Sequence, residues 1–434
     1  MEVKIISPKV SIVRRNTLDP EEKSFLPEET CDRASNKWDG RVFAMFLVFG
    51  IASLTPWNMF ITATNYFEAK FNNSSPGIEE NFPNYFQTGA ICVDVLVSFS
   101  AVPLVQRFSP VKLIYVANTI MLVMFAITSV LAKVDSRTWS LAFFIITEIS
   151  FCIMCGGGAL YISTMWAITS AMNTIYTEAF LIGMSTAGII ASILTIITLS
   201  IPGVDFVGAG FWYFVAATVI LLLSLLLFSQ FHLYYYQQDR TLESPSPDPS
   251  ISTSLKSPLM KLVKDTLPQG YACFCVLYFT FIMFPAVLST LESCGDPDSL
   301  WAKRYFLPVS LFLVFNVGDL IGRLVARLVE FPGRALIPWY TTGRVMFVIL
   351  LLMCNLQPRS LPVWFSDDIA PSVLVFLFAV TSGQVLTLCL RYAPEVSAER
   401  ADKLTVGTIM GVHGALGRVL GSLSTYVVFM VLKF

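Results

Sequence analysis

Long apolar runs, separated by short polar stretches, recur along almost the whole chain. An α-helix crosses a bilayer with about 20 mostly apolar residues, and a window of that length finds eleven such runs. The predicted spans are residues 43–65, 84–106, 111–132, 139–163, 176–200, 210–232, 268–290, 305–328, 336–356, 369–390 and 404–432. The pattern predicts an all-α polytopic membrane protein with about eleven transmembrane helices.

Two longer polar stretches divide these runs. Residues 1–42 carry both signs of charge, and they are too long and too acidic for the start of a signal peptide, so they predict a cytoplasmic tail before an uncleaved first helix. Residues 233–267 are rich in Ser and Pro and predict a disordered cytoplasmic linker. The expected bundles are residues 43–232, with helices one to six, and residues 268–434, with helices seven to eleven.

Composition strengthens this interpretation and excludes other classes. Hydrophobic residues make up 55% of the chain and charged residues 14%, against roughly 25% charged in soluble domains. Lipid must therefore cover much of the surface. A net charge of −1 excludes a basic surface for nucleic acid. The chain has only two histidines, which excludes a His-rich metal site, and no cofactor is expected.

The distribution of basic residues predicts the orientation. Most of the 29 Lys and Arg residues fall on one side if the N-terminus is cytoplasmic and the C-terminus extracellular, as the positive-inside rule requires. This orientation places the overlapping N-glycosylation sequons at Asn72 and Asn73 in the first outside loop. We expect the plasma membrane. The segment Glu22–Leu26 resembles an incomplete dileucine sorting signal, which leaves the endolysosomal membrane as the alternative.

Ionisable residues inside predicted spans are costly in lipid, so they face a cavity or a partner. They are Asp94, Glu148, Asp319, Arg323, Arg344, His413 and Arg418. In the eighth span, steps of three and four place Asn316, Asp319 and Arg323 on one helical face. Such a stripe of donors and acceptors suits a polyhydroxylated ligand. Equally, the Asp–Arg pair could neutralise itself and hold two helices together. Gly318 and Gly322 predict close approach of a neighbouring helix.

The other intramembrane charges favour structural roles. Asp94 and Glu148 are expected to pair with Arg344 or Arg418 rather than to bind substrate. His413 lies in a Gly-rich segment and favours a helix-packing hydrogen bond over a proton switch.

The first span contains Thr55-Pro56-Trp57-Asn58. Its proline kinks the helix, so the indole and the amide that follow can face a cavity.

These residues carry a family likeness. The chain resembles the equilibrative nucleoside transporters in five segments that follow in order: Pro56-Trp57-Asn58, Phe284-Pro285-Ala286, Arg304-Tyr305-Phe306-x-Pro308-Val309-Ser310, Phe315-Asn316-x-x-Asp319-x-x-Gly322-Arg323 and Tyr392-Ala393-Pro394. The resemblance implies an eleven-helix fold, six plus five, related to the major facilitator architecture. It also implies alternating access and passive, bidirectional movement of nucleosides, sometimes nucleobases, across the lipid bilayer.

The resemblance also implies the substrate site. The positions matching Asp319 and Arg323 contact the ribose, with Asn316 beside them, and Trp57 lines the cavity. Ile61 matches a position that faces the outer cavity.

The chain departs from the family at two positions of this site. Ile162 stands where many members have a glutamine that hydrogen-bonds the base, with Ser163 and Thr164 as partial substitutes. A Ser-Asn-Gly of the tenth span is replaced by Thr381-Ser382-Gly383-Gln384. Ribose recognition is therefore expected to be retained, and base recognition to be altered.

Three functions remain open from the sequence. A facilitative nucleoside carrier, which is not an enzyme, leads. A proton-linked or organic-cation carrier of the same fold is the alternative, motivated by Asp94, Glu148 and His413. An intramembrane lipid enzyme would need an acid–base constellation in the bilayer, and a lone histidine in a Gly-rich helix does not provide one.

Overall fold

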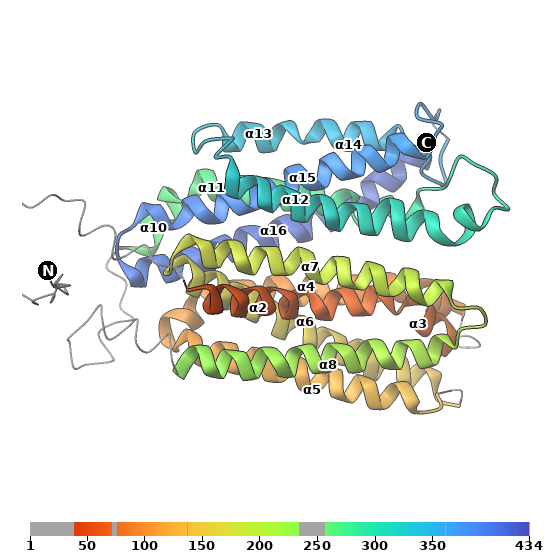
Figure 1. Cartoon of the computed structure of the whole chain (residues 1–434), viewed down its shortest axis with the longest axis horizontal. Helices are drawn as coiled ribbons and strands as arrows, with labels where there is room; N and C mark the ends of the chain where they lie inside the picture. The colour runs from red at the N-terminus through yellow and green to blue at the C-terminus, as the bar shows by residue number, and fades with distance from the viewer. Residues whose placement is uncertain (1–38, 72–75, 137, 234–256, 361, 434) are drawn as a thin grey trace, which may run out of the picture. The chain divides into compact units, whose positions relative to one another are not determined.

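The computed structural model describes residues 39–71, 76–136, 138–233, 257–360 and 362–433. Residues from Gly40 to Phe434 form one compact unit, and the described part of this unit consists almost entirely of helices (Figure 1). The sequons at Asn72 and Asn73 lie outside the described residues, as does most of the predicted tail and linker.

The described part of the first half contains six long helices and one short helix. These are α2 Gly40–Thr62, α3 Thr64–Phe71, α4 Pro76–Arg107, α5 Pro110–Lys133, α6 Ser140–Ser170, α7 Thr174–Ser200 and α8 Phe206–Phe231. We call α2 to α8 the first bundle. All six predicted spans of this half are present, within a few residues except where α4 and α6 run further.

The second half contains the remaining helices, which we call the second bundle. They are α10 Leu259–Asp265, α11 Leu267–Met283, the 3-10 turn Leu288–Thr290, the π-helical turns Trp301–Tyr305 and Leu307–Leu313, α12 Val314–Leu328, α13 Ile337–Gly343, α14 Val345–Leu352, α15 Ile369–Tyr392, the 3-10 turn Ala393–Val396 and α16 Arg400–Lys433. Part of the predicted linker is thus ordered, because residues 259–265 form α10.

Ten helices among the described residues are long and apolar enough to cross a membrane. The predicted ninth span is a shorter apolar stretch, Ile337–Leu352, which breaks at Arg344 between α13 and α14. The prediction of an all-helical membrane fold with about eleven spans is therefore confirmed, with one span interrupted.

In the second bundle, α12 and α15 pack very closely together. A Cβ atom on Gly322 of α12 would lie 2.0 Å from the carbonyl oxygen of Val380 in α15, and one on Gly318 would lie 2.8 Å from that of Phe376. Only glycine permits this approach. The predicted small-residue contact of the eighth span is therefore confirmed, and its partner is α15.

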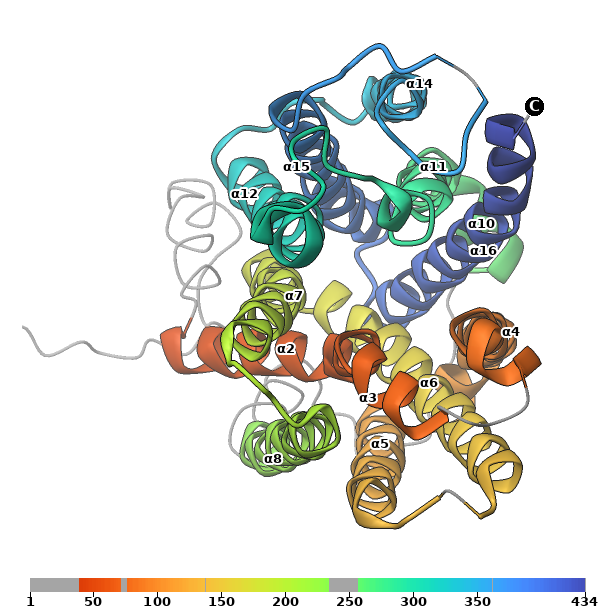
Figure 2. The same ribbon diagram turned by 90° about the vertical axis from the view of Figure 1, so that its right-hand side faces the viewer.

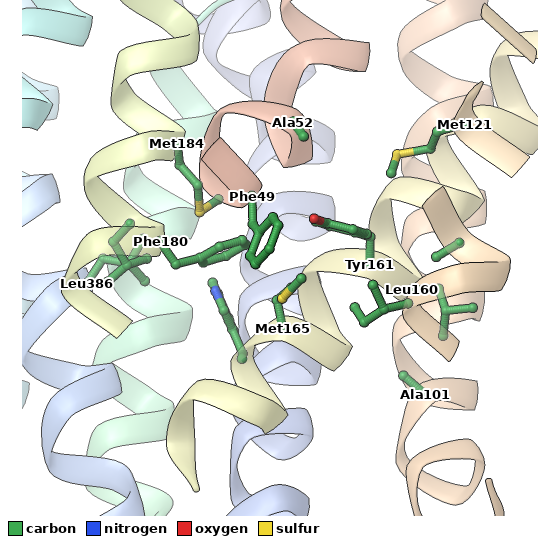
Figure 3. Close-up of a cluster of buried hydrophobic side chains, with 14 of the residues drawn as sticks. Phe49, Ala52, Ala101, Met121, Leu160, Tyr161, Met165, Phe180, Met184 and Leu386 are labelled. Atoms are coloured by element: carbon green, nitrogen blue, oxygen red, sulfur yellow. The ribbon is translucent and has the colours of Figure 1, made fainter. Parts of the chain in front are cut away.

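Aromatic side chains fill the first bundle. Figure 3 shows Phe49 of α2 beside Phe180 of α7, with Met165 and Tyr161 of α6 next to them. Phe60 and Phe151 stack with ring centroids 4.2 Å apart. Much of the unusual phenylalanine content therefore serves packing between helices.

The two bundles meet along two boundaries. In the end-on view of Figure 2, α7 lies beside α12, and α4 lies beside α16, and both pairs are in contact. Helix α16 also packs against α6. The residues between these boundaries are therefore placed where both bundles can reach a common ligand.

Candidate functional site

A cavity of about 220 Å³ lies between the two bundles. Its wall is built by α2, α4, α6 and α7 from one side and by α11, α12, α15 and α16 from the other. Five of the predicted site residues line this cavity: Trp57, Ile162, Asn316, Asp319 and Arg323. Ile61 lies near the end of α2, and its side chain is outside the described part of the structure. The sequence-predicted stripe on α12 thus faces a cavity.

Asp319 and Arg323 form a buried ion pair on the cavity wall. The Arg323 Nε and Nη2 atoms lie 2.9 and 2.8 Å from Asp319 Oδ2. Ser185 of α7 donates a further hydrogen bond of 2.6 Å to the same oxygen. The Nη1 atom of Arg323 has no hydrogen-bond partner among the described residues. The pair therefore retains donor capacity beside an acceptor, within a low-dielectric wall where hydrogen bonds to charges are strong.

Asn316 lies one turn before Asp319 and is held by the π-helical turn that precedes α12 and by α7. Its Nδ2 atom donates to the Phe312 carbonyl at 2.8 Å and to Ser192 Oγ of α7 at 3.4 Å. A Cβ atom on Gly188 would lie 1.9 Å from Asn316 Oδ1. The amide therefore fits only because α7 carries a glycine there.

Trp57 supplies an aromatic surface on the opposite wall. Its ring stacks on Phe151 of α6, with centroids 6.4 Å apart and an interplanar angle of 22°. Pro56 and Asn58 line the cavity beside it. The proline-containing segment of α2 therefore faces the cavity, as its sequence predicted.

Only some of the residues at the two sites of departure from the family pattern line the cavity. Ile162 lines the cavity, but Ser163 and Thr164 are not among the lining residues, so they do not replace an amide there. Ser382 lines it and hydrogen-bonds Thr280 at 3.1 Å. Gln384 points elsewhere, since its Nε2 donates to the Phe331 carbonyl at 2.6 Å.

A second ion pair also lines the cavity. Arg418 of α16 contacts Asp94 of α4 through two hydrogen bonds, Nε to Oδ2 at 2.8 Å and Nη2 to Oδ1 at 3.0 Å. The expected pairing of Asp94 with one of two arginines is therefore confirmed for Arg418. Both side chains also line the cavity that contains Asp319 and Arg323, which the sequence did not predict.

Arg344 does not take the role predicted for it. Its guanidinium lies over the Phe378 ring at 4.6 Å and donates to Thr280 Oγ1 at 3.3 Å. Glu148 contacts neither arginine; the Cys152 thiol donates to its Oε1 at 3.5 Å, and its Oε2 has no partner among the described residues. The prediction that Glu148 pairs with an intramembrane arginine is wrong, because α6 turns it toward its own helix and α4.

His413 makes a local contact. Its Nδ1 lies 2.9 Å from the Ile409 carbonyl, and its ring packs against Gly270 of α11. This arrangement agrees with the helix-packing interpretation of the residue.

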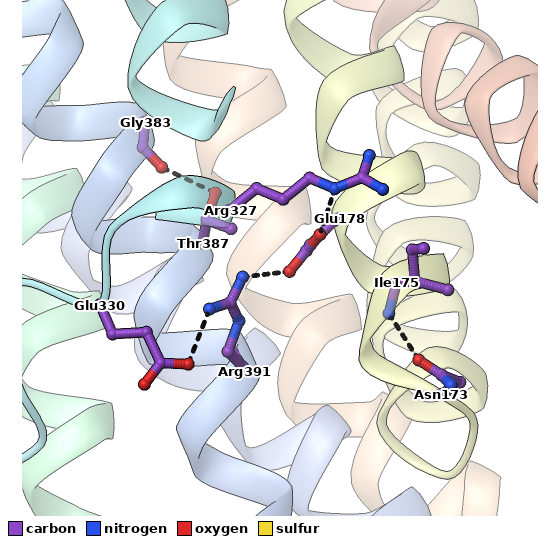
Figure 4. A network of polar contacts seen from close by, with 8 residues as sticks. All are labelled: Asn173, Ile175, Glu178, Arg327, Glu330, Gly383, Thr387 and Arg391. Carbon is purple, nitrogen blue, oxygen red and sulfur yellow. Dashed lines mark hydrogen bonds and ion pairs between the residues drawn. The ribbon is translucent and has the colours of Figure 1, made fainter. Parts of the chain in front are cut away.

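A polar network lies where α7 begins and where α12 and α15 end (Figure 4). Glu178 of α7 pairs closely with Arg391 of α15, and its Oε2 lies 3.7 Å from Arg327 Nε of α12. Arg391 also lies 3.5 Å from Glu330. Sequence reasoning missed this network, although a lone acid at the start of the fifth span and arginines ending the eighth and tenth were visible signals.

Known proteins of similar sequence are nucleoside transporters. The sequence model of a family described as "Nucleoside transporter" matches residues 146–430. The chain is 26% identical to equilibrative nucleoside transporter 3 of Rattus norvegicus, over 91% of this chain and 90% of that protein. It is 26% identical to equilibrative nucleoside transporter 1 of Homo sapiens, over 89% and 96%.

Solved structures of similar fold are transporters of the major facilitator superfamily. The proton:xylose symporter XylE matches with a TM-score of 0.63 at 11% identity, over 88% of this chain and 87% of that chain. The transporter FucP in its outward conformation matches with a TM-score of 0.52 at 12% identity, over 90% and 97%. The expected relation to this architecture is therefore confirmed.

Proposed function

This chain belongs to the nucleoside transporter family, and we propose that it carries nucleosides passively, and in both directions, across a membrane by alternating access. One observation carries the proposal: the Asp319–Arg323 pair lies on the wall of a cavity between the two bundles. The pair belongs to α12 of the second bundle, and Ser185 of α7 connects it to the first bundle by a hydrogen bond. A ligand bound there would contact both bundles, as an alternating-access carrier requires.

The Asp319–Arg323 pair suits a ribose. Vicinal hydroxyl groups both donate and accept, so they need an acceptor and a donor at a fixed separation. One helical turn places the carboxylate and the guanidinium in this way, and Arg323 keeps an unused donor. Asn316 adds an amide beside them, and Trp57 offers a flat surface for a base or sugar to lie against. These four residues form our proposed nucleoside site, and Ile162 borders its base end.

Contacts between the bundles occur near both ends of α7. The Glu178–Arg391 pair joins α7 to α15 at one end. At the other end Tyr305 donates to Ser200 Oγ, the last residue of α7, at 3.2 Å. In the proposed orientation the first contact is cytoplasmic and the second extracellular. Each must open in turn while the other holds, which gives a physical basis for alternation.

The remaining assignments follow from the sequence. We propose that the protein is a multi-pass protein of the plasma membrane with a cytoplasmic N-terminus. We further propose that it is glycosylated at Asn72 or Asn73 and that it also transports nucleobases. The endolysosomal membrane is the alternative location. We propose no enzymatic activity.

The test is uptake of radiolabelled adenosine, uridine and hypoxanthine by cells that lack their own carriers. We expect nucleoside to equilibrate without accumulation, and unlabelled nucleoside on the far side to accelerate exchange. Accumulation above the outside concentration, or failure to carry any nucleoside at the cell surface, would contradict the proposal.

One observation favours a second candidate, a proton-linked carrier: Glu148 Oε2 is buried and has no partner among the described residues. An imposed pH gradient, with and without an ionophore, separates the two functions. A facilitative carrier shows the same uptake whether the pH gradient is present or has been removed by the ionophore. Proton coupling would make uptake follow the gradient and would make Glu148→Gln abolish that dependence.

A further inference from the structure

The cavity carries two carboxylate–guanidinium pairs, which differ in how they are held. Asp319 and Arg323 come from one helix, with side chains 12% and 5% exposed. Asp94 and Arg418 come from helices of different bundles, with side chains 18% and 19% exposed. The second pair is therefore the more open of the two toward a ligand in the cavity.

The contact with Asp94 uses one edge of the Arg418 guanidinium. The bonds involve Nε and Nη2, which share one side of the planar group. A guanidinium has five N–H donors, so the Nη1–Nη2 edge keeps two parallel donors free. The Nη1 atom makes no hydrogen bond to the described part of the chain. The carboxylate of Asp94 fixes the plane of the group and prevents it from turning.

Several other polar groups around the cavity already have hydrogen-bond partners, whereas the neutral Nε1 of Trp166, which also lines the cavity, is buried without a partner among the described residues. Ser185 donates to Asp319, Thr280 bonds Ser382, and Asn316 donates to the backbone of the π-helical turn before α12. Ile162 contributes only hydrocarbon. The free edge of Arg418 is therefore the strongest donor in the described cavity wall that lies outside the Asp319–Arg323 pair.

We propose that Arg418, held by Asp94, reads the base of the substrate and favours 6-oxopurine nucleosides, such as inosine and guanosine, over adenosine. This inference rests on the proposed nucleoside function. Two parallel N–H donors match two adjacent acceptors, and the O6 and N7 atoms of a 6-oxopurine provide that pair. Adenosine places an amino group at position 6, so a donor meets a donor and one bond is lost. Here the discrimination comes from an unfavourable contact as much as from a favourable one.

The experiment combines a ligand change with a protein change. In the ligand, inosine is compared with 7-deazainosine, in which a carbon replaces N7. In the protein, Asp94→Asn with Arg418→Met removes both charges together, so neither is left buried alone. Arg418→Lys keeps the charge beside Asp94 but loses the planar edge. Affinities are measured as competition against labelled adenosine uptake by the full chain in cells, with surface amount determined in parallel.

In the wild-type protein we expect inosine to compete about five- to hundredfold better than 7-deazainosine and better than adenosine. In both variants these ratios should fall toward one. Ser424→Ala is the matched control, because Ser424 also lies on α16 and bonds Tyr278 at 3.0 Å but is not among the lining residues. It should leave both ratios as they are.

Three results overturn the inference. If the variants lose all ligands in equal proportion, the pair only ties α4 to α16. If wild-type protein carries adenosine but shows no preference for inosine over 7-deazainosine, Arg418 does not read the base, whatever the variants do. If no nucleoside is carried at all, the proposed function itself fails, and that outcome is distinguished by the adenosine uptake alone.

Discussion

The hydroxyl of Ser185 in α7 donates a 2.6 Å hydrogen bond to Asp319 Oδ2 in α12, and this bond joins the two bundles at the wall of the cavity. The same oxygen accepts from Arg323. Asp319 belongs to the second bundle and is the proposed acceptor for the ribose. Ser185 therefore connects a ligand bound at Asp319 to the first bundle, which must move relative to the second during transport.

Ser185→Ala should weaken nucleoside affinity. A hydrogen bond to a charged group contributes about 1.5–3 kcal/mol, but Arg323 still neutralises the carboxylate, so we expect a loss near the lower value, about tenfold. Binding to purified protein and uptake kinetics measure it. Ser192→Ala is the control, because Ser192 is the acceptor of only a long 3.4 Å contact with Asn316. Equal effects of the two changes would show that Ser185 acts through packing alone.

Glu178→Gln should destabilise the contact between the bundles at the end where α7 begins. Glu178 and Arg391 have side chains only 7% and 12% exposed. Removing one partner of a buried pair costs about 3–5 kcal/mol, because the other charge is left uncompensated. We expect a lower melting temperature and greater labelling of cysteines placed at that end.

The control for the network is Glu330→Gln. Glu330 is 75% exposed and lies 3.5 Å from Arg391, and exposed pairs contribute little. We expect little change in cysteine labelling in this variant. If labelling increases as much as in Glu178→Gln, Glu178 has no specific role in holding the bundles together at this end.

Much of this arrangement was predictable, and the reasons for the remainder are physical. Hydropathy located the spans because burial in lipid acts on each helix separately. The periodicity of Asn316, Asp319 and Arg323 placed them on one face, and that face lines the cavity. Helices that are distant in sequence are joined by three pairs of residues: Ser185 with Asp319, Asp94 with Arg418, and Glu178 with Arg391. Only the packing of the bundles decides which charge meets which, so local pattern left Asp94 with two possible arginines.

Outside the spans, Asp368 should make stability depend on pH. Burial favours a higher pKa for Asp368, but hydrogen bonds from Ser293 Oγ, the Cys294 amide and Trp301 Nε1 outweigh it and hold the pKa below its usual value. A depressed folded-state pKa stabilises the fold above the unfolded value of about 3.9. That contribution is lost as pH falls through the folded pKa.

Melting temperatures between pH 6 and pH 3 test this effect. We expect Asp368→Asn to lower the melting temperature at pH 6 and to reduce its further fall toward pH 3. Asp298→Asn is the control, since Asp298 forms a surface ion pair with Lys303 and its side chain is 86% exposed. If the wild-type protein and Asp368→Asn lose stability in parallel on acidification, other carboxylates dominate.

Asp319 and Arg323 allow the sharpest test of the ribose assignment. Arg323→Lys keeps the charge but loses the planar fork, and Asp319→Asn keeps the shape but leaves the arginine unpaired. Each should weaken ribonucleoside transport by about ten- to hundredfold, the equivalent of about 1.5–3 kcal/mol. A 2′,3′-dideoxynucleoside lacks both hydroxyl groups, so its transport should fall much less between wild type and variant, and a free nucleobase should behave in the same way. Surface amount and melting temperature separate this loss from misfolding. If well-folded variants lose ribonucleosides and dideoxynucleosides equally, the pair holds α12 to α7 and does not read the sugar.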